Sequence, residues 1–301
     1  MDRLEAMSIL VRAAETGSLS AASRQMGIPL PTVSRNVAEL EAHLKTTLLV
    51  RSRKGLQLTE AGRSYLAAAK GILENITQAE RAAAGEYMAP TGDLVIAAPI
   101  VFGRQHLLPV VAEFLNAFPD VNLRLIQSDK NMHLIDDHID AALRIGELSD
   151  SALKAMALGS VRPVICASPG YIARNGRPNS LEELPRHSCI LAEAFGMPQA
   201  WRIKTEKADI AIPVRSRLIV NTMEAAIDAA LAGVGLTLAL SYQVAEQVRR
   251  GDLQIVLAKF RQPAWPVHFL YNGQDRMPLK LRAFLDFSAP RLRQRLADIK
   301  L

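Results

Sequence analysis

A cluster of basic side chains near the N-terminus has the chemistry to neutralise phosphate groups. Residues 24–63 hold seven Lys or Arg side chains and three Glu side chains, an excess of four positive charges in forty residues. Arg51, Arg53 and Lys54 fall together in LLVRSRKGLQL, between two short apolar runs. Cations on an exposed hairpin can pair with a nucleic-acid backbone and release its counterions. The net charge of +6 is compatible with an anionic partner.

The stretch from Leu30 to Leu44 has the apolar spacing of an amphipathic helix. Its predicted inner face recurs every three or four residues and consists of Val33, Val37, Leu40 and Leu44. The polar residues of its leading turn, which could reach base edges or phosphates, are Thr32, Ser34 and Arg35. We predict that Arg35 contacts a guanine edge or a phosphate, and that Asn36 and Glu39 are solvated.

Two prolines stand at the front of this helix with an apolar residue between them. First-turn amides have no partner within a helix, so Pro29 and Pro31 forfeit no hydrogen bond. The fixed φ of proline also suits the turn. Because Leu30 and Pro31 have no polar side-chain atoms, we predict apolar contacts for them, for example with a thymine methyl group.

Short helices and a hairpin must position these residues. The first helix is predicted from apolar residues at helical spacing, namely Leu4, Met7, Leu10, Val11 and Ala14. Ser18 is expected to cap a second helix over 19–26 that stops at Gly27. The interval to the third helix is typical of a helix-turn-helix. Strands at 48–50 and 56–58 predict a wing.

A long helix is predicted after the hairpin. Thr59 can cap it, and the next break is APTG at 89–92, so it spans about 28 residues. Its apolar residues form one seam: Ala61, Tyr65, Ala69, Ile72, Ile76, Ala79 and Ala83. A single seam of this length favours a partner helix, and packing on its own domain is the alternative.

After residue 92, strand patterns alternate with helix patterns, which predicts a parallel α/β sheet covered on both faces. The predicted strands are 94–99, 121–129, 141–146, 161–169, 216–221, 234–240 and 266–272. The predicted helices are 107–119, 133–140, 170–176, 222–233 and 279–299.

The chain has none of the common catalytic or nucleotide-binding motifs: G-x-S-x-G, H-E-x-x-H, G-x-x-x-x-G-K-[ST] and G-x-G-x-x-G are all absent. The six histidines form no ligand cluster in the sequence, and His133 and His138 lack a third ligand. We therefore expect a binding protein with no metal or other cofactor, and not an enzyme. Ligands of α/β sheets bind at the carboxyl ends of strands and at helix N-termini.

Two cysteines, Cys166 and Cys189, occur without a C-x-x-C motif. Buried thiols in a reducing cytosol are the simpler interpretation, and a thiol-based redox switch between them is the alternative. No stretch reaches the roughly 20 apolar residues of a membrane span, and the N-terminus has no signal-peptide pattern. We expect a soluble, cytoplasmic protein without membrane contact.

The segment SLSAASRQMGIPLPTVSRNVAELEAHLKTTLLVRSRKGLQLTEAG resembles the DNA-binding signature of the LysR-type transcriptional regulators. The resemblance rests on the Ala21-Ala22 pair, Gly27, VSR at 33–35, LE at 40–41 and LTEAG at 58–62. Downstream, DAALRIGEL, VICASPGYIARNGRP, HSCIL and AALAGVGLTLAL resemble the family's effector domain. The resemblance covers essentially the whole chain.

The resemblance implies a winged helix-turn-helix domain over 1–59, a linker and dimerisation helix over 60–89, and an effector-binding domain over 90–301. This last domain would hold two α/β subdomains like periplasmic binding proteins, 90–161 with 267–301, and 162–266. A homodimer or homotetramer would bind double-stranded promoter DNA, respond to a small organic effector and contact RNA polymerase. A solute-binding α/β protein is the alternative. The implied DNA-binding residues are Leu30, Pro31, Thr32, Ser34, Arg35, Arg51, Arg53 and Lys54.

The resemblance also implies an effector cleft between the subdomains. Its lining would comprise Pro99, Ile100, Val101, Phe102, Ser128, Arg144, Gly146, Phe195, Trp201, Asn221, Thr222 and Met223. Many family members place Ser or Thr after the first strand to hold a carboxylate, where this chain has Ile100 and Val101. We therefore expect a less anionic or more apolar effector at that end. Core packing is the alternative for Ile100, Val101 and Thr222, and an ion pair for Arg144.

Overall fold

The computed structural model describes residues 2–52, 55–83, 89–130, 134, 137–148, 153–192, 200–204, 209–260, 262–273 and 277–299. The chain divides into two compact units, and each is described here by itself. One unit is Met1–Gly92 with Ile135–His138, and the other is Asp93–Leu134 with Ile139–Leu301.

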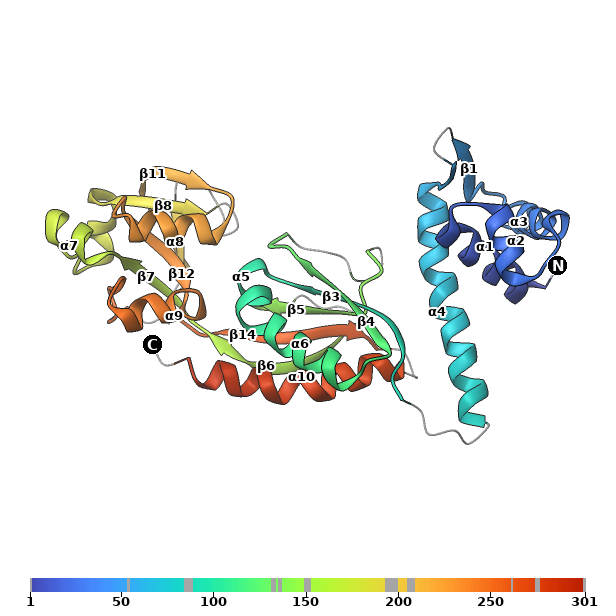
Figure 1. Ribbon diagram of the computed structural model, residues 1–301. Coiled ribbons are helices and arrows are strands. Elements are labelled where there is room, and N and C mark those ends of the chain that lie inside the picture. Colours follow the sequence, from blue (N-terminus) through green and yellow to red (C-terminus); the bar gives the residue numbers. More distant parts are fainter. Residues whose placement is uncertain are drawn as a thin grey trace. The chain divides into compact units, whose positions relative to one another are not determined.

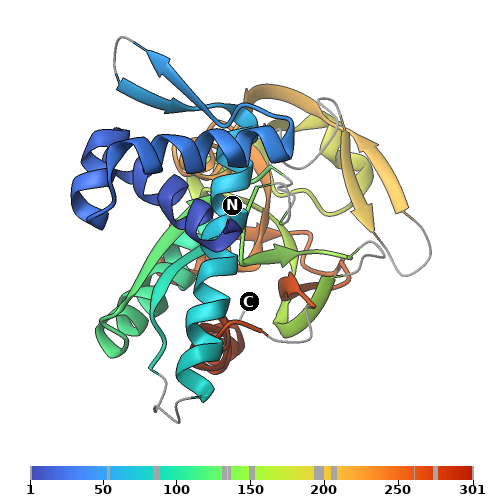
Figure 2. The same cartoon turned by 90° about the vertical axis from the view of Figure 1, so that its right-hand side faces the viewer.

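The first unit contains helices and one hairpin in the predicted order (Figures 1 and 2). Its elements are α1 Arg3–Thr16, α2 Leu19–Met26, α3 Leu30–Leu44, β1 Leu49–Ser52, β2 Gly55–Leu58 and α4 Glu60–Ala83. The predicted caps are confirmed: the Ser18 hydroxyl accepts from the amide of Ala21 at 3.4 Å, and the Thr59 hydroxyl accepts from that of Gly62 at 2.9 Å.

Helix α3 begins at Leu30 as predicted, although no side chain caps it. The carbonyl of Pro29 accepts from the amides of Thr32 at 2.9 Å and Val33 at 3.1 Å. These two bonds close the first turn around Pro31, whose ring nitrogen has no hydrogen to donate. The proline-rich front is therefore compatible with a regular helix start.

Helix α1 packs on a different face from the predicted one. Its buried residues are Ala6, Ile9, Leu10 and Ala13, so of the predicted set only Leu10 is fully buried, while Leu4 is exposed. Small residues let neighbouring helices approach closely, and α1 contacts α2, α3 and α4. Apolar residues occur on more than one side of α1, so spacing alone did not identify the buried face.

The wing is a two-stranded antiparallel hairpin tied to the helices. Strands β1 and β2 pair from Leu49 opposite Leu58 to Ser52 opposite Gly55. The amide of Leu56 donates to the carbonyl of Gly17 at 3.2 Å. Near the start of α4, a Cβ atom at Gly62 would overlap the Leu48 carbonyl oxygen, so only glycine fits there.

The second unit contains two five-stranded sheets and a separate β-hairpin (Figure 1). The first sheet has the order β4-β3-β5-β14-β6, with β3 Gly92–Ala98, β4 Val121–Gln127, β5 Ala141–Ile145, β6 Leu153–Val161 and β14 Trp265–Asn272. The second has the order β11-β8-β12-β7-β13, with β7 Pro163–Ala167, β8 Ser188–Ala192, β11 Arg215–Val220, β12 Leu236–Leu240 and β13 Gln254–Val256. The hairpin is β9 Ala200–Lys204 with β10 Asp209–Pro213.

Both sheets are mixed, so the predicted parallel arrangement is present in only part of each sheet. Strand β3 pairs with β5, and β8 with β11 and β12, in parallel. Strand β14 runs antiparallel to both β5 and β6, and β7 runs antiparallel to β12 and β13. The chain crosses directly from β6 to β7 and returns from β13 to β14, and these direct crossings produce the antiparallel pairs.

Helices cover the sheets as the alternating pattern predicted, with some differences. They are α5 Ile100–Phe102, a π-helix η1 Gly103–Leu107, α6 Leu108–Ala117, α7 Pro169–Asn175, a 3-10 helix η2 Leu181–Arg186, α8 Met223–Leu231, α9 Ser241–Arg250 and α10 Leu279–Ala297. The predicted helix over 133–140 is not seen in Leu134 and 137–140, the described part of that range, which form turns and irregular chain.

The main core of this unit lies between the first sheet and helices α6 and α10, and it continues under the second sheet. Phe114 of α6 packs edge-to-face on Phe284 of α10 at 5.2 Å, and Phe269 of β14 packs on Phe284 at 5.8 Å. The opposite face of the second sheet packs in a separate cluster with the β9–β10 hairpin. No helix within the described residues is long and apolar enough to cross a membrane.

Candidate functional site

The front of α3 is an accessible surface with an apolar tip. Leu30 is 40% exposed, and Pro31 and Arg35 are also exposed. Thr32 and Ser34 are half-buried. The Arg35 guanidinium lies 3.9 Å from the Glu39 carboxylate, with both side chains largely in solvent. Such a pair is weak, so Arg35 can turn toward another anion at little cost.

Asn36 is buried, and the expectation that it is solvated is wrong. Its side-chain amide donates to the carbonyl of Thr32 at 3.1 Å. This bond lies within one turn of α3 and satisfies a polar group that is out of contact with water. Asn36 therefore helps to fix the turn that presents Thr32 rather than facing a ligand.

The carboxylate of Glu41 connects the wing to α3. One of its oxygens accepts from the amides of Leu48 at 2.7 Å and Leu49 at 2.9 Å. Of the predicted wing cations, Arg51 lies in β1, with its backbone opposite Leu56. Arg53 and Lys54 lie outside the described residues, and nothing is described of the Arg51 side chain. The hairpin and its attachment are thus observed, whereas the cation positions stay predictions.

The apolar seam of α4 is covered along only part of its described length. Ala69 is fully buried against the first unit, and Lys70 pairs with Glu15 of α1 at 2.9 Å. One turn later, Ile72 is 42% exposed within that unit. Figure 1 shows α1–α3 beside one half of α4. The predicted seam residues Ala79 and Ala83 have no described side chains.

The segment after β3 combines two half-buried positions with two core positions. Pro99 precedes α5, and the amide of Ile100 donates to the carboxylate of Asp129 at 3.1 Å. Both Pro99 and Ile100 are half-buried. Val101 and Phe102 belong to the main core, so these two predicted cleft residues support packing. The helix start that would face an anion is already occupied by a carboxylate of the chain.

The two sheets meet through an aromatic cluster that follows α5. Phe102 lies 5.0 Å from His106 and 5.2 Å from Tyr242, measured between ring centres. The tyrosine opens α9, on the side of the second sheet. Across the same junction Arg104 lies 3.5 Å from Glu224 of α8. The junction predicted to hold the effector is therefore built from η1, α8 and α9.

Burial changes the acid–base properties of this cluster. Desolvation lowers the pKa of His106 to about 4, and the positive charge of Arg295 acts in the same direction. Desolvation raises the pKa of Tyr242, while a hydrogen bond from Gln243 acts against it. Both rings are therefore neutral at pH 7. No hydrogen bond from any described residue reaches either ring nitrogen of His106.

The other predicted cleft residues fall into two groups. Ser128, Asn221 and Thr222 are at least partly accessible at strand or helix ends, and the Thr222 hydroxyl caps α8 by accepting from Ala225 at 3.3 Å. Met223 is buried in the main core. The position of Thr222 is therefore explained by capping, in addition to any ligand contact.

Arg144 and Gly146 lie at the end of β5. Arg144 is half-buried, and desolvation lowers its pKa. It has interactions of its own within the chain. Gly146 has φ of +112° and donates its amide to the carbonyl of Pro266 at 2.9 Å. This glycine is thus required by the backbone path from β5.

Trp201 packs in the core on the outer face of the second sheet. Its neighbours in that cluster are apolar, which leaves little of the ring for a ligand between the sheets. The prediction that Trp201 lines the cleft is thus not supported by its burial. Phe195, predicted beside it, lies outside the described residues.

Cys166 and Cys189 are free, buried and poorly placed for a disulfide. They lie in β7 and β8, with β12 between them, so their Cα atoms are about 9–10 Å apart by strand spacing. A disulfide requires at most about 7 Å. Burial also raises the pKa of each thiol to about 12. The redox alternative is therefore disfavoured.

No three His, Cys, Asp or Glu side chains of the described residues gather into a possible metal site. His133 lies outside those residues, and His138 is exposed.

Two family models match the chain and leave little of it uncovered. The model described as "Bacterial regulatory helix-turn-helix protein, lysR family" matches residues 4–63, and "LysR substrate binding domain" matches residues 89–293. The chain belongs to the LysR family of transcriptional regulators. The regulator therefore combines an N-terminal helix-turn-helix domain with an α/β domain of the effector-binding type.

Named relatives agree with this assignment over nearly their full lengths. The regulator is 31% identical to the transcriptional repressor PA14_22550 of Pseudomonas aeruginosa, covering 95% of this chain and 91% of that one. It is 28% identical to the transcriptional activator AaeR of Escherichia coli, with coverage of 95% and 93%. The structure of CrgA from Neisseria meningitidis matches with a TM-score of 0.62 at 30% identity, covering 98% and 99% of the two chains.

Several residues with structural roles at these sites were not singled out by the sequence. Glu41 belongs to the family motif, which gives no indication of its contact with the wing, and Asp129, Glu224 and Tyr242 belong to no motif in the sequence. An acid directly after a strand end, as at Asp129, and an acid in the first turn of a helix, as at Glu224, are signals that could have identified two of them. Tyr242 opens a helix that the sequence pattern did not predict.

Proposed function

We propose that the regulator binds promoter DNA as a homodimer or homotetramer, and that a small organic effector bound between its two sheets controls it. The proposed domains are 1–59 for DNA, 60–89 for the linker and dimerisation helix, and 90–301 for the effector. The effector domain would divide into 90–161 with 267–301, and 162–266. We further propose that it works in the cytoplasm, contacts RNA polymerase and catalyses no reaction.

The exposed front of α3 is the observation that carries the DNA-binding proposal. An accessible helix start beside a hairpin is the geometry with which such motifs enter the major groove. Arg35 would contact a guanine edge or a phosphate, while the wing cations Arg51, Arg53 and Lys54 would pair with phosphates. Thr32 and Ser34 would position the helix on the backbone.

The apolar tip gives this regulator a distinctive operator preference. Leu30 and Pro31 would contact a thymine methyl group in the major groove. Binding-site selection with the full-length protein and Pro31→Ser tests this contact. We expect the serine variant to relax the requirement for thymine at one position of each half-site, and an unchanged selected motif would contradict the contact.

The wing assignment is tested by the salt dependence of binding to the DNA upstream of the regulator's own gene. Arg53→Ala should weaken binding to all sequences alike and reduce the slope of log K against log salt by about 1. Arg249→Ala, which removes an equal charge from an exposed side chain near the end of α9, is the matched control. An intact slope in Arg53→Ala would refute the wing contact.

The exposed part of the α4 seam supports the oligomer. Ile72 lies one turn beyond the covered Ala69, on a helix whose seam extends well past α1. An apolar seam at this spacing is satisfied by a second helix. Ile72→Glu should lower the mass measured by sedimentation from oligomer toward monomer. Glu80→Lys, also on α4, serves as the control for a surface change.

The proposed effector is neutral or cationic where it meets Ile100. The start of α5 already holds the Asp129 carboxylate at 3.1 Å, and Glu224 lies across the junction. A ligand carboxylate placed there would face repulsion from Asp129, whereas the charge of Glu224 is compensated by Arg104. Matched amides, amines and carboxylates can be screened by thermal shift on the full-length protein.

Asp129→Asn and Ile100→Asp test this effector class with the best binder. Asp129→Asn keeps an oxygen acceptor for the backbone amide of Ile100 but removes the negative charge. The affinity for carboxylate ligands should therefore rise relative to the affinity for amide ligands. Ile100→Asp adds a charge and should weaken anionic binders further. Equal affinities in all three proteins would contradict the assignment of Ile100 to the cleft.

A further inference from the structure

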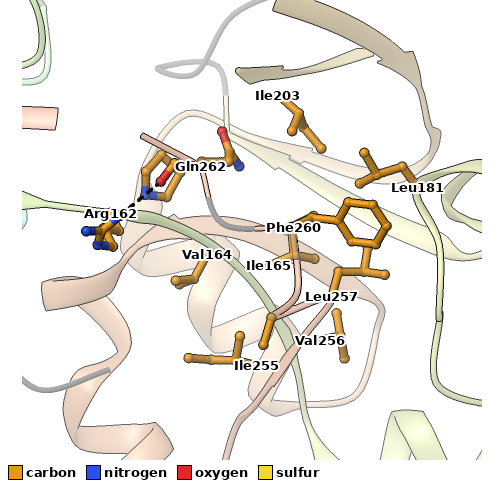
Figure 3. A pocket seen from close by; sticks show the side chains of 12 residues that line it. Arg162, Val164, Ile165, Leu181, Ile203, Ile255, Val256, Leu257, Phe260 and Gln262 are labelled. Carbon is orange, nitrogen blue, oxygen red and sulfur yellow. Dashed lines mark hydrogen bonds between the residues drawn. The ribbon is translucent and has the colours of Figure 1, made fainter. Parts of the chain in front are cut away.

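A cavity lies within the effector-binding domain, and its lining does not include the aromatic cluster of Phe102, His106 and Tyr242. It has a volume of about 180 Å³. It is lined by strands β7 and β13, the start of η2, strand β9 of the hairpin, and residues 257, 258, 260 and 262, which precede β14 (Figure 3). Benzene fills an engineered cavity of about 150 Å³ in another protein, so this cavity has room for a molecule slightly larger than benzene.

One wall of the cavity is apolar and belongs to the surrounding core. Ile165, Leu181, Ile203 and Val256 line it, and all four are buried members of the cluster on the outer face of the second sheet. Phe260 also lines the cavity but is 41% exposed. An aromatic ring in that position is accessible at the edge of an apolar pocket, where it can cover a bound ring.

The opposite end of the cavity is polar. Figure 3 shows Arg162 and Gln262 at one end, with Phe260, Leu181 and Leu257 at the other. Gln262 is only 5% exposed. In the described part of the chain, no hydrogen bond involves its side-chain amide, and only its backbone carbonyl is engaged, by the Arg162 guanidinium at 3.3 Å. The side-chain amide of Gln262 is therefore available to a ligand in the cavity.

Arg162 supplies the charge at this polar end. One guanidinium nitrogen is used by the Gln262 carbonyl, and no ion pair forms between Arg162 and any described carboxylate. The guanidinium group carries five N–H donors in a planar arrangement that matches a carboxylate. Arginine and a buried amide at one end, with an apolar wall at the other, form a pocket for an amphipathic anion.

We propose that this cavity is a second binding site, for a small monocarboxylate with a ring or a branched alkyl body. The body lies against Ile165, Ile203 and Val256 under the Phe260 ring. The carboxylate accepts from the Arg162 guanidinium and from the Gln262 amide nitrogen. This ligand class differs from the neutral or cationic effector proposed for the junction, and the proposal does not depend on DNA binding.

The site lies where the chain crosses between the two sheets. Arg162 is the single residue between β6 and β7, and Gln262 belongs to the returning segment before β14. The amide of Arg162 donates to the Ser241 hydroxyl at 3.1 Å, and the Ser241 amide donates to the Arg162 carbonyl at 2.7 Å. The next residue, Tyr242, packs on Phe102 at the junction. A bound carboxylate would therefore contact both crossing segments, close to the hydrogen bonds between Arg162 and Ser241.

Methyl-labelled isoleucine in the full-length protein provides a direct test, with benzoate as the probe. Ile165, Ile203 and Ile255 line the cavity, whereas Ile100 reports on the junction. We expect benzoate to shift the methyl signals of the cavity isoleucines in a saturable way and to leave Ile100 comparatively unaffected. Shifts at Ile100 alone, or no saturable shift, would overturn the proposal.

Two variants and a matched control identify the contacts. Arg162→Gln should weaken benzoate about tenfold, because a charge-assisted hydrogen bond is lost from an exposed side chain. The same variant should leave the affinity for benzyl alcohol, which has the same ring without the charge, nearly unchanged. Arg215→Gln removes one positive charge from β11, another strand of the same sheet, and should have no effect. Equal weakening in both Arg variants would show non-specific attraction and refute the site.

Ile203→Phe fills the cavity from its apolar wall and should abolish binding of both probes. Its thermal unfolding and the unperturbed signal of Ile100 establish that the domain remains folded. Should that variant misfold, Gln262→Leu provides the second measurement, with weaker benzoate binding expected and retained affinity for benzyl alcohol. Unchanged benzoate binding in a folded Ile203→Phe would contradict the assigned cavity.

Discussion

Replacement of Glu41 by alanine should loosen the wing without unfolding the helices. One Glu41 oxygen accepts the amides of Leu48 and Leu49 at 2.7 and 2.9 Å. Each hydrogen bond to a charged acceptor contributes about 1.5–3 kcal/mol. Leu48 is buried and Leu49 is half-buried, so water can replace only part of the loss. We expect the local opening free energy of the wing to fall by about 2–4 kcal/mol.

Native-state amide hydrogen exchange measures this effect where it occurs. A loss of 2 kcal/mol corresponds to about thirtyfold faster exchange, expected at Leu48 and Leu49 and not in α1. Glu41→Gln retains one oxygen acceptor and should give a smaller change. Glu39→Ala removes a largely exposed carboxylate from the same helix and should leave the wing amides unaffected. Similar exchange in Glu41→Ala and Glu39→Ala would refute the reasoning.

Three further predictions concern stability and reactivity. Gly62→Ala should lower the melting temperature of the first unit, because the new Cβ atom would overlap the backbone of Leu48. Gly71→Ala on the same helix places its Cβ atom in open space and should stabilise the first unit by about 0.5–1 kcal/mol. Equal effects of the two variants would contradict the packing at Gly62. Because burial raises the pKa of the Cys166 and Cys189 thiols to about 12, both stay protonated and should resist Ellman's reagent at pH 8 until denaturant is added. Burial lowers the pKa of His106 to about 4, so the unfolded state takes up the proton first. Between pH 6.5 and pH 4, the free energy of unfolding should therefore fall by about 2 kcal/mol more in the unmodified protein than in His106→Phe. Urea unfolding at the two pH values measures this difference.

The first unit was predictable because its local signals agree with its packing. Ser18, Gly27 and Thr59 each mark a helix boundary through their own backbone or side-chain chemistry, and each does so in the structure. The side of α1 that is buried was not predictable, because the choice between apolar faces depends on how closely α3 and α4 approach. The burial of Asn36 was missed for a similar reason, since a polar residue can be satisfied within its own helix.

The second unit was predicted less completely, for reasons of topology. Strand β6 has many exposed positions, so it lacks the apolar run of a buried strand. Helix α9 follows β12 with no glycine or proline between them, and its sequence, SYQVAEQVRR, is largely polar. Direct crossings between the sheets produce antiparallel pairs, which the alternation of strand and helix patterns in the sequence does not predict. The positions of the junction residues depend on those crossings, so the sequence alone does not indicate the roles of Asp129 and Tyr242.

The place of β14 in the first sheet has a consequence for how the regulator is made. This strand pairs Val267 with Ile145 on one side and Trp265 with Val161 on the other. On the ribosome, β5 and β6 must therefore wait for more than a hundred residues of synthesis before their shared neighbour emerges. All strands of the second sheet have emerged from the ribosome once Val256 has emerged. The sheet encoded first thus closes last, and a nascent chain that stops before residue 265 exposes two unpaired strand edges to aggregation.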